Sequence, residues 1–380
     1  MQKNTIRRIA KKMGIGIGIL LGIICITGLA FIYLSPQFGK KASARQKATY
    51  ALLPNYKNGK FINPEKIEME MSVRSFSKMF RQMLNPHPDV NPHEDIKVVK
   101  LTQDLLTNET DSSNQIIWLG HSSFLIKLDG KTILLDPVFS NKTGPHPLMG
   151  RKKYNSQMPI DLLHLPRVDA VFISHDHYDH LDYFSIMELK NKTKQFFVPI
   201  GVGNHLLSWG VDKKIIKEMN WWEESKWNNL KIAFTPSRHM SGRGFSDQSS
   251  TLWGSWVIQG KENKIFFSGD GGYGNHFKEI GEKYGPFDFG LIECGQYNKL
   301  WADVHMMPEE SVQAGIDVNA KELIPIHWGS FRLANHAWTE PVERFVTESI
   351  KRKVKYRTPR IGEAITINSI QISDAKKWWN

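Results

Sequence analysis

Apolar residues gather in short runs that recur along most of the chain and are separated by polar turns. Ten of these runs are five to seven residues long and carry many Val, Ile and Phe residues, which is typical of strands. We expect strands at 116–120, 123–128, 132–136, 170–175, 195–200, 230–236, 255–259, 264–270, 289–294 and 323–328. Stretches between some of them predict helices, among them 181–191, 203–210 and 307–318. Strands with helices interspersed predict an α/β protein of two or more layers.

The first fifty residues follow a different pattern. Residues 13–34 contain no charged side chain, and about 20 apolar residues are enough for a helix to cross a bilayer. We therefore predict a basic N-terminal tail at 1–12 and a single-pass transmembrane anchor at 13–34. Basic residues are slightly more numerous before the helix than after it, so we expect the rest of the chain to be extracytoplasmic. The tripeptide ASA at 42–44 keeps a cleaved signal peptide as an alternative.

The segment after the anchor is marked by turn signals, such as NPHPDVNPHED at 85–95. Clusters of Asn, Pro and Gly interrupt regular structure. We expect 35–113 to be a linker and an N-terminal extension packed on the domain, and 114–380 to be the domain itself.

The formal charge of +12 is unevenly distributed. Residues 1–50 hold nine basic residues and no Asp or Glu, so only +3 belongs to the rest of the chain. The basic excess flanks the apolar segment, which favours contact with a membrane surface. The near-neutral remainder lacks the basic surface that a nucleic-acid partner requires. Of the two cysteines, Cys25 lies inside the apolar segment and Cys294 far from it, so we expect no internal disulfide.

Four of the expected strands lead into a residue that can bind a metal ion. These residues are His175, His239, Asp270 and His327. In open α/β sheets, sites gather beyond the strand ends. Four separate strands that deliver His or Asp to such ends therefore predict one metal site.

The densest cluster is HDHYDH at 175–180. Residues two apart in extended backbone point the same way, so His175 and His177 can grip one ion together. Asp179 and His180 follow where the chain turns, and can face a second ion. Histidine and carboxylate ligands suit zinc. The number of candidate ligands fits two ions about 3.5–4 Å apart that share a carboxylate.

These residues resemble the hallmark of the metallo-β-lactamase superfamily, in which HxHxDH is followed by a His, an Asp and a last His. The resemblance implies a four-layer αβ/βα metallo-β-lactamase sandwich with the metal ions at one edge. A narrower resemblance is to N-acyl-phosphatidylethanolamine phospholipase D and its bacterial relatives. It is carried by WLGHSSFLI (118–126), LLDPVFS (134–140), GDGGYG (269–274), VHMMPEE (304–310) and IHWGSFRLAN (326–335). The stretch ECGQYNKLW (293–301) departs from the family's IGAY form, and we expect it to line the cleft.

The resemblance implies two Zn²⁺ ions per chain, each with its own ligands. One ion would be held by His175, His177 and His239. The other would be held by Asp179, His180 and His327, with Asp270 bridging the two. A hydroxide between the ions would act as the nucleophile, because zinc lowers the pKa of bound water to about 7. Asp179 and Asp270 would thus serve catalysis as well as metal binding.

Other candidate residues lie near these motifs. His305 precedes the helix start at Pro308, and we expect it in the cleft, where it would donate a proton or bind the substrate head group. Asp136 is expected to brace a metal-binding histidine. His121 either hydrogen-bonds within the site or forms a tight turn. The remaining histidines are given no role: His87, His93, His146, His164, His205, His276 and His336.

The expected function is that of a membrane-anchored dinuclear zinc hydrolase, of phospholipase D type, acting on N-acyl-phosphatidylethanolamine-like lipids or another small phosphodiester. The same site would also suit a lactone or a cyclic phosphodiester, because one nucleophile attacks carbonyl carbon or phosphorus. A non-catalytic zinc-binding envelope protein is disfavoured, since structural zinc sites are usually rich in cysteine. No nucleic-acid partner is expected, and an oligomer is compatible with the sequence.

Overall fold

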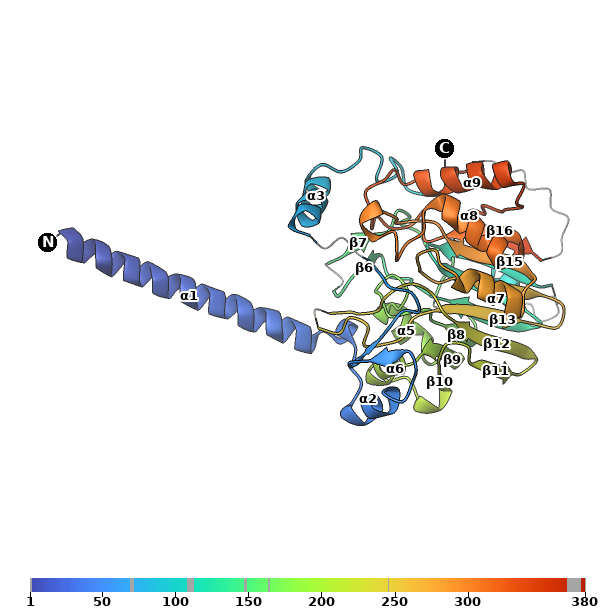
Figure 1. The fold of residues 1–380 in the computed structure, drawn as a ribbon, viewed down its shortest axis with the longest axis horizontal. Helices are drawn as coiled ribbons and strands as arrows, with labels where there is room; N and C mark the ends of the chain where they lie inside the picture. The colour runs from blue at the N-terminus through green and yellow to red at the C-terminus, as the bar shows by residue number, and fades with distance from the viewer. Residues whose placement is uncertain are drawn as a thin grey trace.

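The computed structural model describes residues 2–68, 72–107, 113–146, 149–162, 165–244, 246–367 and 377–379. Two sheets stack face to face at its centre (Figure 1). The first has the strand order β10-β9-β8-β5-β4-β3-β17, and the second has the order β11-β12-β13-β14-β15-β16. All ten predicted strands are confirmed, with ends shifted by up to three residues.

The first sheet consists of β3 (Gln115–Gly120), β4 (Ser123–Leu128), β5 (Lys131–Leu135), β8 (Val168–Phe172), β9 (Thr193–Pro199), β10 (Ile216–Met219) and β17 (Ala364–Thr366). The second consists of β11 (Glu224–Trp227), β12 (Leu230–Thr235), β13 (Ser255–Gln259), β14 (Lys264–Phe267), β15 (Phe287–Glu293) and β16 (Ala320–Ile326). Two short pairs lie outside these sheets, β1 (Tyr56–Lys57) with β2 (Lys60–Phe61) and β6 (Lys142–Thr143) with β7 (Arg151–Lys152).

Alternation along the strands divides the apolar residues between two layers. In β3, Ile116 and Trp118 belong to the core between the sheets, whereas Ile117 and Leu119 pack on the outer face. This follows from the pleat, which turns successive side chains to opposite faces. Across the core, the rings of Phe172 and Trp256 meet edge to face at 5.1 Å.

Helices cover both outer faces, which gives the predicted four-layer αβ/βα sandwich. The first sheet is covered by α5 (Tyr183–Leu189) and α6 (Gly203–Ser208), and the second by α7 (His276–Tyr284), α8 (Pro308–Asp317) and α9 (Glu340–Arg352). The three helices predicted between the strands are therefore confirmed. Pro308 stands in the first turn of α8, where its missing N–H costs nothing.

The N-terminal region adds short elements to this sandwich. They are η1 (Pro36–Phe38), α2 (Ala44–Tyr50), α3 (Val73–Leu84) and α4 (Gln103–Thr107). Two single helical turns lie later in the chain, η2 (Lys213–Ile215) and η3 (Lys299–Trp301). The rings of Tyr50, Tyr56 and Phe61 form a buried cluster. The backbone N–H of Phe61 donates to the carbonyl of Ser249 at 2.8 Å, which ties this region to a loop of the domain.

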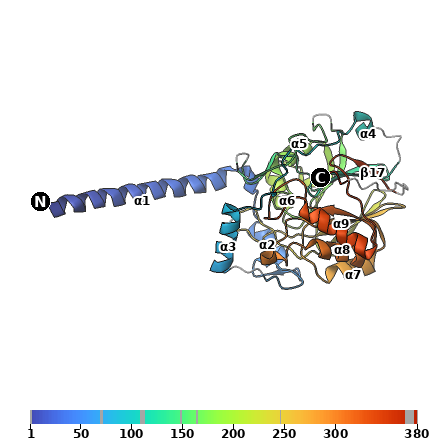
Figure 2. The ribbon, with the colours of Figure 1, turned by 90° about the horizontal axis from the view of Figure 1, so that it is seen from above.

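Helix α1 (Gln2–Leu34) projects away from the rest of the molecule, as both views show (Figures 1 and 2). The most apolar 18-residue window of its segment Thr5–Leu34 has a mean hydropathy of 2.7, and none of that window is buried against the domain. Within the described residues it is the one helix long and apolar enough to cross a membrane.

Candidate metal centre

Most of the candidate ligands lie at the carboxyl ends of parallel strands from both sheets, whereas His239 follows β12, which is antiparallel to its neighbours. β5, β8 and β9 run parallel in the first sheet, and β14, β15 and β16 run parallel in the second. Because parallel strands end at the same edge, the residues that follow them gather there. The loop after β8 carries HDHYDH, β14 leads to Asp270, and β16 leads to His327.

Three histidines bring one nitrogen atom each to a common point. His175 Nε2 lies 2.9 Å from His177 Nδ1, and His239 Nε2 lies 3.2 Å from the same atom. Tetrahedral zinc with Zn–N bonds of ~2.0–2.1 Å holds its nitrogens about 3.3 Å apart. These three side chains therefore have the geometry of one metal-binding triad.

In two rings of this triad, those of His175 and His239, the other nitrogen is engaged by the protein. His175 Nδ1 lies 2.9 Å from the hydroxyl of Ser174, and His239 Nδ1–H donates to the carbonyl of Val304 at 3.0 Å. Asn63, from the N-terminal region, holds both backbone polar groups of His239 with its side-chain amide. Such contacts fix each ring so that its free nitrogen faces the site.

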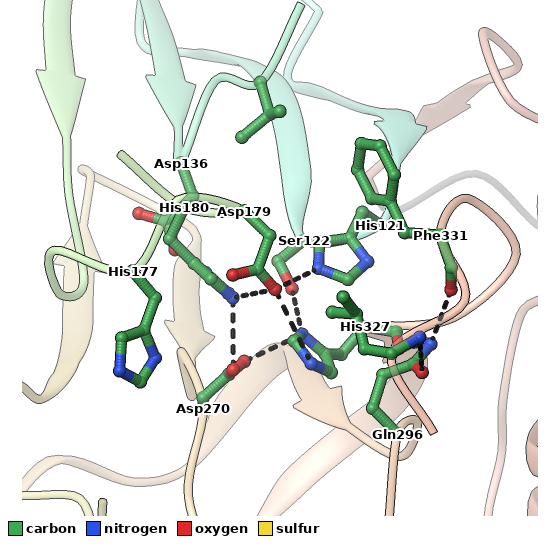
Figure 3. A network of polar contacts seen from close by, with 12 residues as sticks. His121, Ser122, Asp136, His177, Asp179, His180, Asp270, Gln296, His327 and Phe331 are labelled. Carbon is green, nitrogen blue, oxygen red and sulfur yellow. Dashed lines mark hydrogen bonds and ion pairs between the residues drawn. The ribbon is translucent and has the colours of Figure 1, made fainter. Parts of the chain in front are cut away.

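A second group of side chains, Asp179, His180 and His327, lies beside Asp270 (Figure 3). The carboxylate of Asp270 lies 3.1 Å from His180 Nε2 and 2.9 Å from His327 Nδ1. It also lies 3.9 Å from His175 Nε2, so it reaches both groups. Asp179 Oδ2 lies 3.5 Å from His180 Nε2 and 4.0 Å from His327 Nε2.

Two residues from the first sheet hold this second group in place. Asp136, directly after β5, accepts a hydrogen bond from His180 Nδ1–H at 2.7 Å and from Ser174 at 2.5 and 2.7 Å. His121, in the turn between β3 and β4, lies with Nε2 2.9 Å from Asp179 Oδ2. His121 was expected either to hydrogen-bond within the site or to form a tight turn. It does both, because its backbone φ is +54° and its ring contacts Asp179.

The electrostatics of the two groups differ. Burial, reinforced by neighbouring imidazoles, holds the pKa of His175 and of His239 well below the ordinary value, so both rings are neutral and suited to bind a cation. Burial works to raise the pKa of Asp270, but the imidazoles of His180 and His327 hold it well below the usual range. In His180 burial is likewise outweighed, and Asp270 and Asp179 raise its pKa well above the ordinary value. The second group therefore attracts positive charge.

Buried polar atoms without a hydrogen-bond partner converge on the same place. Among the described residues they include Asp270 Oδ1, His180 Nε2 and His327 Nε2. A buried polar atom that lacks a partner costs about 1–3 kcal/mol. A metal ion between these atoms would satisfy them, so the second group fits one cation beside the cation that the histidine triad fits.

A cleft of about 320 Å³ opens over these groups. Its floor includes His177, Asp179, Asp270 and His327, and His305 stands at its side. Its walls are mostly apolar and are formed by Met79, Met240, Leu300, Trp301, Val304 and Leu333. Gln296, Leu300 and Trp301 belong to ECGQYNKLW, so this stretch lines the cleft as expected.

All eight residues predicted for the site lie together at this edge. Sequence reasoning gave no role to His205, yet its ring is buried and supports the HDHYDH loop. Its Nδ1 accepts from the backbone N–H of Lys40 at 2.9 Å, and its Nε2–H donates to Asp176 at 3.2 Å. The partners are far apart in the sequence, which is why no local pattern revealed them. His164 lies outside the described residues.

Comparisons with known proteins agree with this geometry. Residues 131–328, about half of the chain, match the family described as the beta-lactamase superfamily domain. An uncharacterized protein of Mycobacterium tuberculosis is 38% identical over 317 residues, which cover 82% of this chain and 84% of the relative. The N-acyl-phosphatidylethanolamine-hydrolyzing phospholipase D 1 of Caenorhabditis elegans is 32% identical over 293 residues, which cover 72% of this chain and 82% of that enzyme.

A solved structure supports the fold. The metallo hydrolase of the archaeon Ignicoccus hospitalis superposes with a TM-score of 0.51 at 22% identity, over 68% of this chain and 99% of that protein. The stacked sheets, the His and Asp clusters at one edge and the sequence matches lead to the same assignment. The chain belongs to the metallo-β-lactamase superfamily and is a metal-dependent hydrolase related to the N-acyl-phosphatidylethanolamine-hydrolyzing phospholipases D.

Proposed function

We propose that the protein is a membrane-anchored dinuclear zinc hydrolase that cleaves the phosphodiester bond of N-acyl-phosphatidylethanolamine-like lipids. The observation that carries the proposal is the pair of adjacent ligand groups beneath a cleft with apolar walls. His175, His177 and His239 would hold one ion, and Asp179, His180 and His327 the other, with Asp270 between them. Bound zinc supplies Lewis acidity and lowers the pKa of water to about 7.

The protein's own side chains supply orientation. Asp136 and His121 hold His180 and Asp179 in place from behind, so the candidate ligands need little rearrangement when a substrate arrives. The apolar walls exclude water and accept the hydrocarbon part of a lipid. His305 lines the same cleft, where it is placed to contact the head group or the leaving oxygen.

The apolar helix also supports the proposal that the substrate is a lipid. Helix α1 would place the domain at the bilayer surface, where phospholipids are found. The relative from Caenorhabditis elegans is by its name an enzyme that hydrolyses N-acyl-phosphatidylethanolamine. We propose that the anchor crosses the membrane once and that the catalytic domain lies on the extracytoplasmic side.

The test uses the full chain in detergent micelles, loaded with zinc and incubated with N-acyl-phosphatidylethanolamine in ¹⁸O-water. Mass spectrometry should find phosphatidic acid with one ¹⁸O in its phosphate, together with unlabelled N-acylethanolamine. Asp270→Asn should release neither product, whereas Asp288→Asn, on the same sheet but distant from the cleft, should behave like the wild type.

A zinc-loaded wild type that releases no phosphatidic acid would overturn the lipid substrate. Parallel incubations with a lactone and with a cyclic phosphodiester would then identify which other bond the centre cleaves.

A further inference from the structure

Glu293 carries a buried carboxyl group and belongs neither to the HDHYDH motif nor to the candidate metal ligands. It is the last residue of β15 and its side chain is fully buried, between the apolar residues Ile292 and Cys294 of the same core. A carboxylate in such a place is costly unless donors satisfy it. Its presence beside the candidate metal centre therefore calls for a specific partner.

Two donors hold this carboxyl group. The backbone N–H of Gly271 donates to Glu293 Oε2 at 2.8 Å, and the Nδ1–H of His305 donates to Oε1 through a short hydrogen bond. Gly271 directly follows Asp270 and is fixed by the chain. Since that donor cannot rotate away, Glu293 is held in one orientation, and it holds the imidazole of His305 in turn.

The imidazole of His305 is thereby placed with one nitrogen at Glu293 and the other free. Its ring lies 5.2 Å from the ring of His239 and 5.3 Å from that of His327, measured between centroids. The side chain is 17% exposed, whereas Glu293 is fully enclosed. Because Nε2 is on the opposite side of the ring from Nδ1, it is directed away from Glu293, and His305 lines the cleft.

A role for Glu293 as a metal ligand is the competing interpretation. Its carboxylate does lie in one cluster with Asp270, His305 and His327. Both of its oxygens are already engaged by donors, however, and neither is among the buried atoms that lack a partner. Within this cluster the unsatisfied atoms belong to Asp270 and His327 instead, which favours these two residues over Glu293 as metal ligands.

We propose that Glu293 is a positioning residue for hydrolysis, which fixes the tautomer and the orientation of His305 so that its Nε2 lone pair faces the cleft, where it accepts a hydrogen bond from the head group of the substrate. The inference rests on the proposed function, because it assigns His305 to the substrate side of the same cleft. The stretch that departs from the family's IGAY form thus supplies both a wall of the cleft and, through Glu293, the support of a cleft residue.

Glu293→Gln tests the role with minimal change in shape. The fixed N–H of Gly271 requires the amide oxygen of the new side chain, so the amide NH₂ must face His305 Nδ1. His305 is then forced into the tautomer with its proton on Nε2. Loss of such a supporting contact typically costs about 10- to 100-fold in activity, and we expect kcat to fall by this factor with two metal ions still bound per chain.

The coupling to His305 is tested by a double-mutant cycle in the full chain. If Glu293 acts through His305, the double variant Glu293→Gln/His305→Gln is no slower than His305→Gln alone. Glu322→Gln, a change on the neighbouring strand β16, is the matched control and should retain wild-type kcat. Additive losses in the cycle, or a fall in metal content in Glu293→Gln, would overturn the proposal.

A readout that needs no substrate separates this inference from the proposed function. In protein labelled with ¹⁵N-histidine, above pH 8, the signal lost in His305→Gln identifies His305. Its wild-type nitrogen shifts should show the proton on Nδ1, and Glu293→Gln should move it to Nε2. The same tautomer in both proteins contradicts the role of Glu293, even if the lipid is cleaved. A switch of tautomer in a protein that cleaves no lipid supports the positioning and rejects only the substrate.

Discussion

At the scale of single residues, Asp136 is a buried side chain that supports the candidate ligand His180 from behind. Its carboxylate accepts from His180 and from both the N–H and the hydroxyl of Ser174. In Asp136→Asn, one oxygen becomes an NH₂ group that faces donors. His180 should then lose its orientation, and we expect metal affinity or activity to fall about 10- to 100-fold.

Equilibrium dialysis against a zinc chelator, together with initial rates, measures this effect. Asp169→Asn is the control, because Asp169 pairs with Lys194 away from the cleft. Unchanged zinc retention and an unchanged rate in Asp136→Asn would show that His180 needs no support.

Lys153 is a second buried charged group, with a consequence for stability. Burial lowers its pKa to about 8, although Asp182 opposes the shift, and its ammonium donates to the carbonyl of Val138 at 2.6 Å. Between pH 8 and 10.5 the unfolded chain therefore holds a proton that the folded chain does not. The free energy of unfolding should rise with pH in this window, by up to about 3 kcal/mol relative to Lys153→Met.

Denaturant unfolding of both proteins in micelles, at pH values across this window, checks the prediction. Lys152→Met replaces the exposed neighbour and should leave the wild-type pH profile in place. Parallel profiles for the wild type and Lys153→Met would mean that Lys153 titrates normally.

Most residues of the candidate site can be predicted from the sequence, because they lie in the short motif HDHYDH or directly after predicted strands. Asp136 was also predicted to brace a histidine. Glu293 was not singled out, since a glutamate within a run of apolar residues gives no signal until Gly271 and His305 are seen around it. The same holds for His205, whose partners Asp176 and Lys40 are brought to it only by the fold.

At the scale of elements, the strands of the two large sheets that the sequence did not reveal lie at the edges of these sheets. β10 and β17 flank the first sheet and β11 flanks the second. Central strands such as β3 and β4 are buried throughout, so most of their residues are apolar. The edge strands are short and mostly half-exposed or exposed, and their mixed sequences resemble those of loops.

The segment that links α1 to the domain is held against the domain by hydrogen bonds. Trp209 and Arg243 donate side-chain hydrogen bonds to the carbonyls of Pro36 and Gln37, both at 2.7 Å. Gly39 has φ +70°, and a Cβ atom there would lie 2.0 Å from Nδ1 of His205. Since His205 supports Asp176 in the HDHYDH loop, this turn is joined to the candidate metal centre.

Gly39→Ala should therefore impair both stability and metal binding. Gly59→Ala is a matched control, because Gly59 has φ +79° but open space around it. We expect a backbone cost of about 1–3 kcal/mol at either position, and a further loss of stability and zinc affinity only at Gly39. Thermal unfolding and zinc titration measure the two effects, and equal behaviour of the two variants would show that the turn is independent of the loop.

At the scale of the whole molecule, the charged groups and the apolar helix divide the chain into two parts. The domain is close to neutral, whereas the basic excess lies around α1. We expect the wild type to stay in the membrane pellet after alkaline carbonate extraction. Leu20→Arg/Leu21→Arg should release it, because each charge at the centre of a spanning helix costs about 2.5–3.5 kcal/mol.

Leu20→Ala/Leu21→Ala is the control for this extraction and should remain in the pellet. Wild-type protein in the carbonate supernatant would reject the anchor. Protease added to intact spheroplasts should cleave the domain if it lies outside, and digestion only after lysis would reverse the proposed topology.

The most direct test of the account is a count of metal ions in the same protein whose hydrolysis is measured. Native mass spectrometry of the full chain, released from micelles after zinc loading, should find two ions per chain. Asp270→Asn should hold fewer and should lose hydrolysis of the phosphodiester in parallel. A chain that hydrolyses its substrate with one ion or none, or an Asp270→Asn variant that keeps two ions and full activity, would contradict the dinuclear centre.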